Sequence, residues 1–127
     1  MKKKILIIDD EKDFCYFIKA NLELFPGYEV VIATSGEKGL RASSKKKPDL
    51  ILLDIMMPKM DGLEVLDKLK QDTKTMDIPV IMLTAKNEEE SKMEAASLYS
   101  VDYLIKPVET NTLKSKIDEV LAITKLF

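Results

Sequence analysis

The sequence predicts an α/β domain in which helices cover both faces of a five-stranded parallel sheet. Three observations predict this class: apolar runs of strand length recur along the 127 residues, segments with helical spacing of apolar residues separate them, and the connections are short. Such alternation favours parallel strands joined by right-handed crossovers. A chain of this length most economically forms one core, so residues 1–127 are predicted to be a single domain.

Five segments are predicted to be the strands. Four of them are uninterrupted apolar runs, which is the pattern of strands that are buried in a sheet. The fifth is less apolar, but polar residues and Pro107 bound it. The five runs are "ILII" from Ile5, "VVIA" from Val30, "LILL" from Leu50, "VIML" from Val80 and "DYLI" from Asp102.

Apolar residues at helical spacing predict the helices between these strands. Asn87 and Glu90 resemble a capping box that opens a further helix through Met93 and Ala96. A helix is also predicted from Gly36, although a glycine inside it, Gly39, lowers helix stability by about 1 kcal/mol relative to alanine. The periodic positions are Phe14, Phe17, Ile18, Leu22 and Phe25 after Asp13; Leu63, Leu66 and Leu69 after Gly62; and Leu113, Ile117, Val120 and Leu121.

The composition excludes several classes of function. The 20 basic and 22 acidic residues nearly balance, so no direct binding to nucleic acid is predicted. Histidine is absent, which excludes Ser-His-Asp and Cys-His catalysis. The single cysteine, Cys15, is interpreted as a small apolar helix residue and suits a reducing cytoplasm. Without a signal peptide or an 18-residue apolar run, a cytoplasmic chain with no membrane insertion is expected.

Polar residues stand where the predicted strands end. The first strand runs into Asp9 and Asp10, the third into Asp54, the fourth into Thr84 and the fifth into Lys106. Each has an ordinary explanation by itself, such as helix capping for Asp10. Together they point to one site, because ligands of open α/β sheets bind beyond the carboxyl ends of the strands.

The chemistry of this set indicates phosphoryl transfer. Three aspartates at one edge repel one another unless a cation neutralises them, and Mg²⁺ favours carboxylates, water and phosphate oxygen. Lys106 would add a fixed positive charge, and Thr84 a hydrogen bond. The apolar run "LILLDIMM" predicts that Asp54 is buried, where an uncompensated charge is costly. We therefore predict Asp54 to be the nucleophile that becomes an aspartyl phosphate.

In combination and in this order, these segments resemble the receiver domains of two-component response regulators, as in the chemotaxis regulators. The resemblance covers essentially the full chain. It implies a flavodoxin-like sheet with strand order 2-1-3-4-5. The matching segments are "IIDDE" around Asp9 and Asp10, "DLILLDIMMPKMDG" around Asp54, "PVIMLTA" ending at Thr84 and Ala85, and "DYLIKP" around Lys106.

The resemblance also implies roles for the site residues. Asp54 would accept a phosphoryl group from a sensor histidine kinase or a phosphotransfer protein. The cofactor would be Mg²⁺, at a site formed by Asp54, Asp10, Asp9 and Met56. Asp10 would bind the ion directly, Asp9 would act mainly through water, and Met56 would contribute its backbone carbonyl. Lys106 would pair with Asp54 and later with the phosphoryl group.

A second set of implied roles concerns the conformational switch. Thr84 would hydrogen-bond the phosphoryl group, small Ala85 would leave room for it, and Tyr103 would turn inward as the population shifts. The Lys106–Pro107 peptide bond is expected to be cis, as in the family. The family's usual surface for a dimer partner, target or output domain is formed by the fourth helix, the fifth strand and the fifth helix.

The sequence departs from the family pattern in three places. Tyr99 and Ser100 stand where Gly-Ala is usual before the fifth strand, which affects the turn beside the switch residue. Gly39 replaces a usual alanine and is expected to cost stability only. Met56 and Lys86 occupy positions beside the phosphoryl pocket that vary widely in the family and tune the access of water.

Two other classes of function compete with a phosphoacceptor switch that catalyses only its own phosphorylation and dephosphorylation. A magnesium-dependent aspartyl phosphatase usually has a second aspartate two residues after its nucleophile, where this chain has Met56. A nonphosphorylated interaction module, or a flavodoxin-like cofactor binder, could use the same scaffold. Nucleotide binding is disfavoured because the four glycines form neither GxGxxG nor a P-loop.

Overall fold

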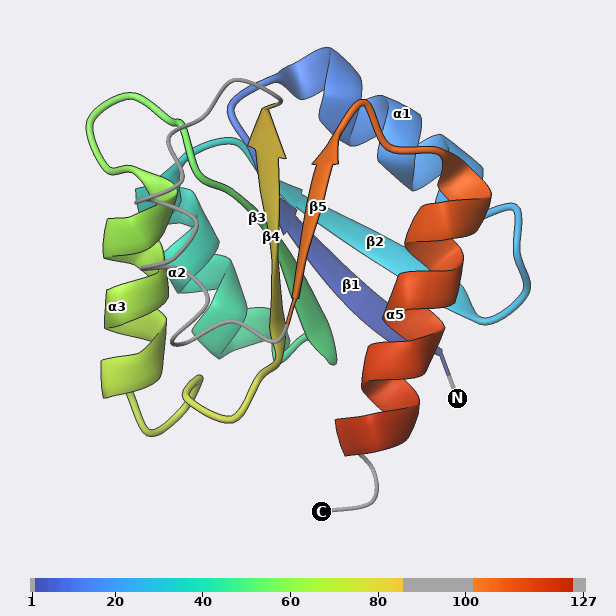
Figure 1. Ribbon diagram of the computed structural model, residues 1–127. Helices are drawn as coiled ribbons and strands as arrows, with labels where there is room; N and C mark the ends of the chain where they lie inside the picture. The colour runs from blue at the N-terminus through green and yellow to red at the C-terminus, as the bar shows by residue number, and fades with distance from the viewer. Residues whose placement is uncertain (1, 86–101, 125–127) are drawn as a thin grey trace.

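The computed structural model describes residues 2–85 and 102–124, which form one parallel sheet with helices on both faces (Figure 1). The strand order is β2-β1-β3-β4-β5, which confirms the predicted order. All four neighbouring pairs are parallel. The strands are β1 (Lys3–Ile8), β2 (Tyr28–Ala33), β3 (Leu50–Asp54), β4 (Val80–Ala85) and β5 (Asp102–Lys106).

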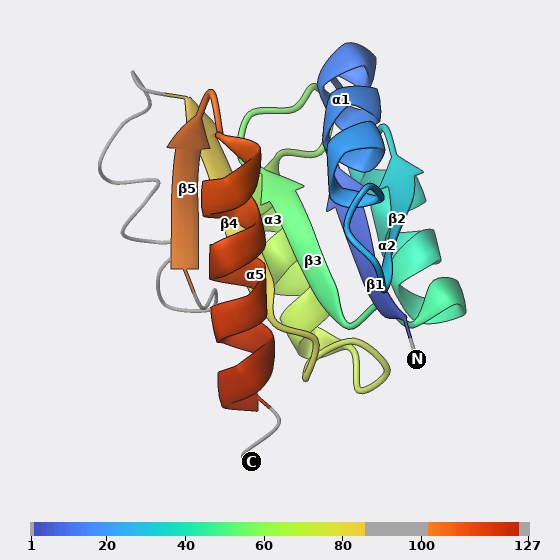
Figure 2. The same ribbon diagram turned by 90° about the vertical axis from the view of Figure 1, so that its right-hand side faces the viewer.

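The helices lie in two layers. In Figure 2, α1 and α5 lie on the face of the sheet that is turned toward the viewer, with α2 and α3 behind it. The predicted helix from Asn87 to Ala96, together with Lys86, Tyr99 and Ser100, lies outside the described residues. None of the helices in the described ranges combines the length and apolar character needed to cross a bilayer. The helices are α1 (Lys12–Leu22), α2 (Gly36–Lys46), α3 (Gly62–Gln71) and α5 (Thr110–Thr124).

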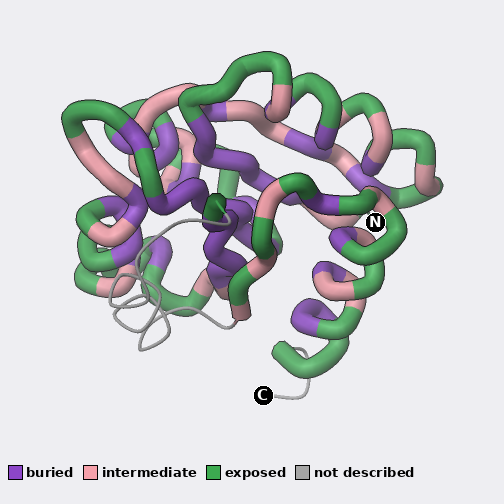
Figure 3. The backbone as a smooth tube through the Cα atoms, turned by 45° about the horizontal axis from the view of Figure 1, so that its top comes forward, coloured by how far each residue is buried: buried purple, intermediate pink, exposed green. Residues whose placement is uncertain are grey.

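Alternation along the strands divides the apolar residues between two cores. In β1, Ile5 and Ile7 pack toward α1 and α5, whereas Leu6 and Ile8 pack toward α2 and α3. Strand β3 alternates in the same way. Both strands are covered on both faces, as their continuous apolar runs predict, and Figure 3 shows the buried strands in the middle of the molecule.

Side-chain caps fix the starts of two helices. Ser35 accepts a hydrogen bond from the N–H of Lys38 at the start of α2, at 3.2 Å. Asp61 accepts one from the N–H of Glu64 at the start of α3, at 3.0 Å. These bonds satisfy N–H groups that have no partner within the helix. The helix predicted from Gly36 therefore forms, with a cap directly before it.

The first helix is shorter than its apolar spacing predicts, because α1 ends at Leu22 and Phe25 lies beyond it. Pro26 follows Phe25, and a residue before proline is disfavoured in helical conformation. Gly27 then turns the chain into β2 with a φ of 87°. Phe25 is still part of the fold, because its ring packs edge-on against Tyr28 with 6.4 Å between the ring centroids.

The close packing of α2 on β1 explains Gly39. A Cβ atom at Gly39 would lie 2.6 Å from Cδ1 and 2.7 Å from Cγ2 of Ile8. An alanine would gain about 1 kcal/mol of helix propensity, but overpacking a core costs about 1–3 kcal/mol. The expectation that Gly39 costs stability only is therefore wrong, because the missing side chain makes room for Ile8.

Helix α1 also covers the outer edge of β2. The N–H of Val30 donates to Glu23 Oε2 at 2.8 Å, and its carbonyl accepts from Lys19 Nζ at 2.7 Å. Lys19 and Glu23 form an ion pair of 2.9 Å with each other. The carbonyls of Gly27 and Ala33 accept hydrogen bonds from the N–H groups of Lys3 in β1 and of Asp9 directly after it. By alternation, the backbone of Val30 therefore faces away from the sheet.

At the amino end of the sheet, α5 is held by a group that we call the Asp118 clamp (Lys3, Tyr28, Lys114 and Asp118). The Asp118 carboxylate accepts from Lys3 Nζ at 3.0 Å, from Lys114 Nζ at 2.8 Å and from the Tyr28 hydroxyl. Burial would raise the pKa of Asp118, but the hydrogen bonds from Lys114, Tyr28 and Lys3 outweigh it and lower this pKa to about 2. The clamp thus ties the last helix to the first two strands.

Candidate functional site

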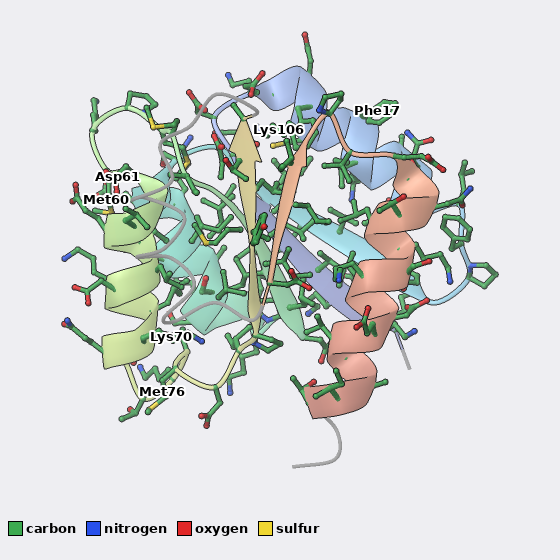
Figure 4. The ribbon with its side chains drawn as sticks, in the orientation of Figure 1. Phe17, Met60, Asp61, Lys70, Met76 and Lys106 are labelled. Carbon is green, nitrogen blue, oxygen red and sulfur yellow. The ribbon has the colours of Figure 1, made fainter. Side chains whose placement is uncertain are left out.

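Three carboxylates share the Lys106 ammonium at the carboxyl end of the sheet. Lys106 Nζ lies 2.7 Å from Asp9 Oδ2, 2.9 Å from Glu11 Oε1 and 3.5 Å from Asp54 Oδ1. One carboxylate oxygen of each acid lies within 4.8 Å of the other two. Figure 4 places Lys106 at the end of β5, near the start of α1. The group therefore has three negative charges around one positive charge.

The acids of this group differ in burial. Asp9 is 0% and Asp54 is 4% exposed, whereas the Glu11 side chain is 64% exposed. Burial raises the pKa of Asp9 above its usual range, although the Lys106 ammonium and the N–H of Glu11 act to lower it. Among the described residues, Asp9 Oδ2 has no well-directed hydrogen bond, so its compensation comes from the ammonium beside it.

The environment of Lys106 keeps its side chain charged. Burial alone would lower the pKa of Lys106, but its close ion pair with Asp9, its hydrogen bond to Glu11 and the charge of Asp54 raise this pKa above the usual range. The ammonium also lies over the ring of Phe14, 4.5 Å from the centroid. The side chain of Lys106 is 15% exposed, so the positive charge is fixed in a largely dry position.

A tight loop after β3 positions Asp54. The N–H of Gly62 donates to the carbonyl of Ile55 at 2.7 Å, which folds the loop back onto the end of the strand. A Cβ atom at Gly62 would collide with the carbonyl oxygen of Asp54, so glycine is required at this close approach. Lys59 has a φ of 68°, in the left-handed region, within the same loop.

The donor set of the site fits Mg²⁺. Carboxylate oxygens are the ligands that this ion prefers, and it tolerates a site in which water completes the shell. The surplus of negative charge and the buried Asp9 oxygen that lacks a directed hydrogen bond are both features that a cation would relieve. Asp9, Glu11 and Asp54 are the described acids whose oxygens come together closely enough to share an ion.

Comparison with known proteins gives matches over nearly the whole chain. Residues 5–118 match the family described as the response regulator receiver domain. The chain is 40% identical over 121 residues to the alkaline phosphatase synthesis transcriptional regulatory protein PhoP of Bacillus subtilis (strain 168), a match covering 95% of this chain and 49% of PhoP. It is 41% identical over 119 residues to the phosphate regulon transcriptional regulatory protein PhoB of Pseudomonas aeruginosa, covering 94% of this chain and 52% of PhoB.

Solved structures of response regulator receiver domains are also similar to this chain. The response regulator receiver domain protein of Clostridium thermocellum superposes with a TM-score of 0.86 at 34% identity, covering 97% of both chains. The CheY-like receiver domain protein of Methanospirillum hungatei JF-1 superposes with a TM-score of 0.87 at 32% identity, covering 98% of both chains. The chain belongs to the response regulator receiver domain family. It spans about half the length of the curated relatives that it matches.

The structure of this receiver domain brings together three of the residues that the sequence predicted for the site, Asp9, Asp54 and Lys106. The third predicted acid, Asp10, is exposed and is not part of the group of three acids, and its role as a metal ligand stays a prediction. Glu11, which was not predicted as a site residue, is part of the group. Glu11 stands in the quoted segment "IIDDE", so its position beside the two aspartates was the available signal.

The predicted switch residues of the receiver domain lie on β4 and β5. Thr84 is fully buried, and its hydroxyl donates to the carbonyl of Ala85 at 3.1 Å. Tyr103 is 47% exposed. Met56, predicted to offer its carbonyl to the metal, has an exposed side chain, as that role allows. The Lys106–Pro107 peptide bond is cis, which confirms the prediction.

Proposed function

We propose that Asp54 accepts a phosphoryl group from the phosphohistidine of a sensor histidine kinase or a phosphotransfer protein. The position of Asp54 carries this proposal: it is a buried carboxylate at the end of a central strand, and its neighbours are an ammonium and two further acids. Membership of the receiver domain family supports it. The donor histidine lies outside these 127 residues, because they contain no histidine.

In the proposed transfer, an Asp54 carboxylate oxygen attacks phosphorus while the phosphorus–nitrogen bond of the donor breaks. The imidazole nitrogen leaves with the electron pair of that bond, and Asp54 becomes an acyl phosphate. Mg²⁺, when bound, neutralises charge on the phosphoryl oxygens. The residues that would hold it are Asp54, Asp10 and the Met56 carbonyl directly and Asp9 mainly through water, and Glu11 is a further candidate from the geometry.

The proposed readout is a shift between two conformations. Thr84 would release the Ala85 carbonyl and donate its hydroxyl hydrogen to the phosphoryl group, with Lys106 binding another phosphoryl oxygen. Tyr103, half exposed in this structure, would turn inward into the space that Thr84 leaves. The surface of β5, α5 and the predicted fourth helix would then present a changed face to a partner copy, target or output domain.

The domain is proposed to catalyse its own phosphorylation and dephosphorylation without turning over a separate substrate, and to act in the cytoplasm. An output domain that binds DNA is a further proposal. The relatives PhoP and PhoB are named as transcriptional regulatory proteins, and this chain matches about half of each. The receiver domain itself carries nearly balanced charge, which does not favour its own binding to DNA.

The experiment that tests this function uses a small phosphodonor. Incubation with acetyl phosphate and Mg²⁺ is expected to add one phosphoryl group per chain, measured by intact mass. Asp54→Asn should abolish the gain, while Asp67→Asn, a control on the exposed side of α3, should retain it. Uptake of a phosphoryl group by the Asp54→Asn protein would exclude Asp54 as the acceptor. Loss of the gain when Mg²⁺ is chelated is expected as well.

A further inference from the structure

We propose that Phe14 and Glu11 hold Lys106 in a resting position on the α1 side of the site, and that release from this position limits how readily Asp54 is phosphorylated. The inference rests on the proposed function of Asp54. It treats Phe14 and Glu11 as positioning residues, because both act through Lys106.

Lys106 is bound more closely by Asp9 and Glu11 than by Asp54. Its ammonium is 2.9 Å from Glu11 and 2.7 Å from Asp9, both at hydrogen-bonding range, but 3.5 Å from Asp54. Ammonium–carboxylate hydrogen bonds are normally about 2.7–2.9 Å long, so the contact with Asp54 is the loosest of the three. In the structure described here, Lys106 is therefore bound most closely by residues next to or at the start of α1, and less closely by the acceptor.

The ring of Phe14 is a further partner of the Lys106 ammonium. The Lys106 ammonium lies 4.5 Å from its centroid, within the range of a cation–π interaction. Phe14 is half buried and packs against the core between α1, α5 and the sheet, so its ring cannot easily follow the lysine if the lysine moves. Because the Lys106 side chain is largely shielded from water, this attraction is stronger than it would be at an exposed site.

Transfer to Asp54 requires this arrangement to change. In the proposed mechanism Lys106 binds a phosphoryl oxygen, which means that the ammonium must turn from α1 toward Asp54. The contacts with Phe14 and Glu11 are made in the resting state and are lost in the product, so they slow the reaction. Glu11 is mostly exposed and its ion pair is screened by water, so we expect Phe14 to have the larger effect.

A neighbouring aromatic residue offers a matched control. Phe17 also lies on α1, lines the same depression of about 520 Å³ as Glu11, Phe14 and Lys106, and is 52% exposed. Figure 4 labels Phe17 and Lys106 and shows them as separate side chains at this end of the molecule. Phe17→Leu therefore changes the same surface without removing the ring beneath the ammonium.

The first measurement uses unphosphorylated protein without metal. The NMR signal of the Lys106 ammonium protons should be shifted upfield by the Phe14 ring in the unmodified protein. Phe14→Leu should remove this shift, Phe14→Tyr should retain it, and Phe17→Leu should leave it unchanged. Glu11→Gln should speed the exchange of these protons with water. A signal that is the same in Phe14→Leu and in the unmodified protein would overturn the proposal, whatever the result with a phosphodonor.

The second measurement is the rate of phosphorylation by acetyl phosphate with Mg²⁺. Given the usual strength of a partly desolvated cation–π contact, Phe14→Leu should react about two- to tenfold faster, and Phe14→Tyr and Phe17→Leu at the unmodified rate. An equal or lower rate for a folded Phe14→Leu protein would overturn the proposal.

If Phe14→Leu fails to fold, the Glu11→Gln variant decides the question, because unchanged exchange of the Lys106 protons with water in that variant would also overturn the proposal. If the unmodified protein takes up no phosphoryl group, the proposed function of Asp54 fails, and with it the role in phosphorylation, whereas the NMR experiment still decides where Lys106 rests.

Discussion

The two ends of the sheet use the same ion-pair chemistry in opposite proportions. At the carboxyl end, three carboxylates surround the single ammonium of Lys106. At the amino end, two ammonium groups and a hydroxyl surround the single carboxylate of Asp118. The pKa of Asp118 is lowered to about 2, whereas burial raises the pKa of Asp9. The charge of the Asp118 carboxylate is therefore balanced by its donors, whereas the site around Lys106 has an excess of negative charge.

This difference separates a structural role from a functional one. A carboxylate with several donors gains nothing from a further cation and contributes to stability. Crowded buried carboxylates with too few donors destabilise the fold but favour the binding of a cation, and strongly perturbed groups in such arrangements are typical of functional sites. Substitutions at the two ends should therefore differ in size and in sign.

The largest effect is expected for Lys106→Met. This change leaves Asp9 and Asp54 buried without their cation, so the free energy of unfolding without metal should fall by about 3–5 kcal/mol. Mg²⁺ should restore part of this loss, because it replaces the missing positive charge. Urea unfolding with and without Mg²⁺ measures both effects. A loss that Mg²⁺ does not reduce would contradict the excess of negative charge at the site.

A smaller loss is expected for Asp118→Asn, about 1–2 kcal/mol near neutral pH, because the clamp residues are partly exposed to water. The pKa of Asp118 is about 2 in the folded protein, below its ordinary value of 3.8. Its stabilisation is thus complete above the ordinary value and is lost as the pH falls toward 2. Unfolding measured from neutral pH downward should show the variant and the unmodified protein converging below about pH 4. A constant difference across this range would contradict the assignment.

Asp9→Asn should have the opposite sign. Lys106 keeps Glu11 and Asp54 as partners, and the site loses one buried negative charge. In metal-free buffer the free energy of unfolding should rise by up to about 1 kcal/mol. The same urea titration, run beside Asp118→Asn, compares the two ends directly. If both aspartate substitutions destabilise the protein equally, the two ends do not differ in the way that their ion pairs suggest.

The smallest effect is expected for Lys114→Met. Asp118 keeps the Lys3 ammonium at 3.0 Å and the Tyr28 hydroxyl, so the clamp remains satisfied. The free energy of unfolding should fall by about 0.5 kcal/mol, the usual size for a partly exposed ion pair. Compared with Lys106→Met, this variant tests whether loss of a lysine lowers the free energy of unfolding more when no second lysine contacts the same carboxylates. A loss as large as that of Lys106→Met would contradict the comparison.

Local patterns in the sequence were sufficient to predict the fold. The apolar runs from Ile5, Leu50 and Val80 lie in buried strands, and their continuity reflects cover on both faces. The periodic positions from Leu63 and from Leu113 lie in α3 and α5. The predictions failed where packing between distant segments decides the outcome, as at Gly39, whose space is taken by Ile8.

The site was predictable to the extent that it depends on strand ends. Asp9, Asp54 and Lys106 each follow or end a strand, so a parallel sheet places them at one edge. Glu11 and Phe14 were not predicted to be site residues, because their contacts with Lys106 depend on how α1 is oriented relative to the end of β5. That angle is set by packing between segments more than 90 residues apart in the chain, which no local pattern records.

The cover that α1 gives to β2 has a consequence for assembly. An outermost strand normally offers unpaired backbone groups to any other extended segment, which is a common route to aggregation. Here the peptide groups of Val30 are already bound by Glu23 and Lys19, at the middle of the strand. A sixth strand could pair with β2 at this edge only after the hydrogen bonds of Val30 to Glu23 and Lys19 were broken. The end of α1 therefore protects this edge of the sheet from pairing with another strand.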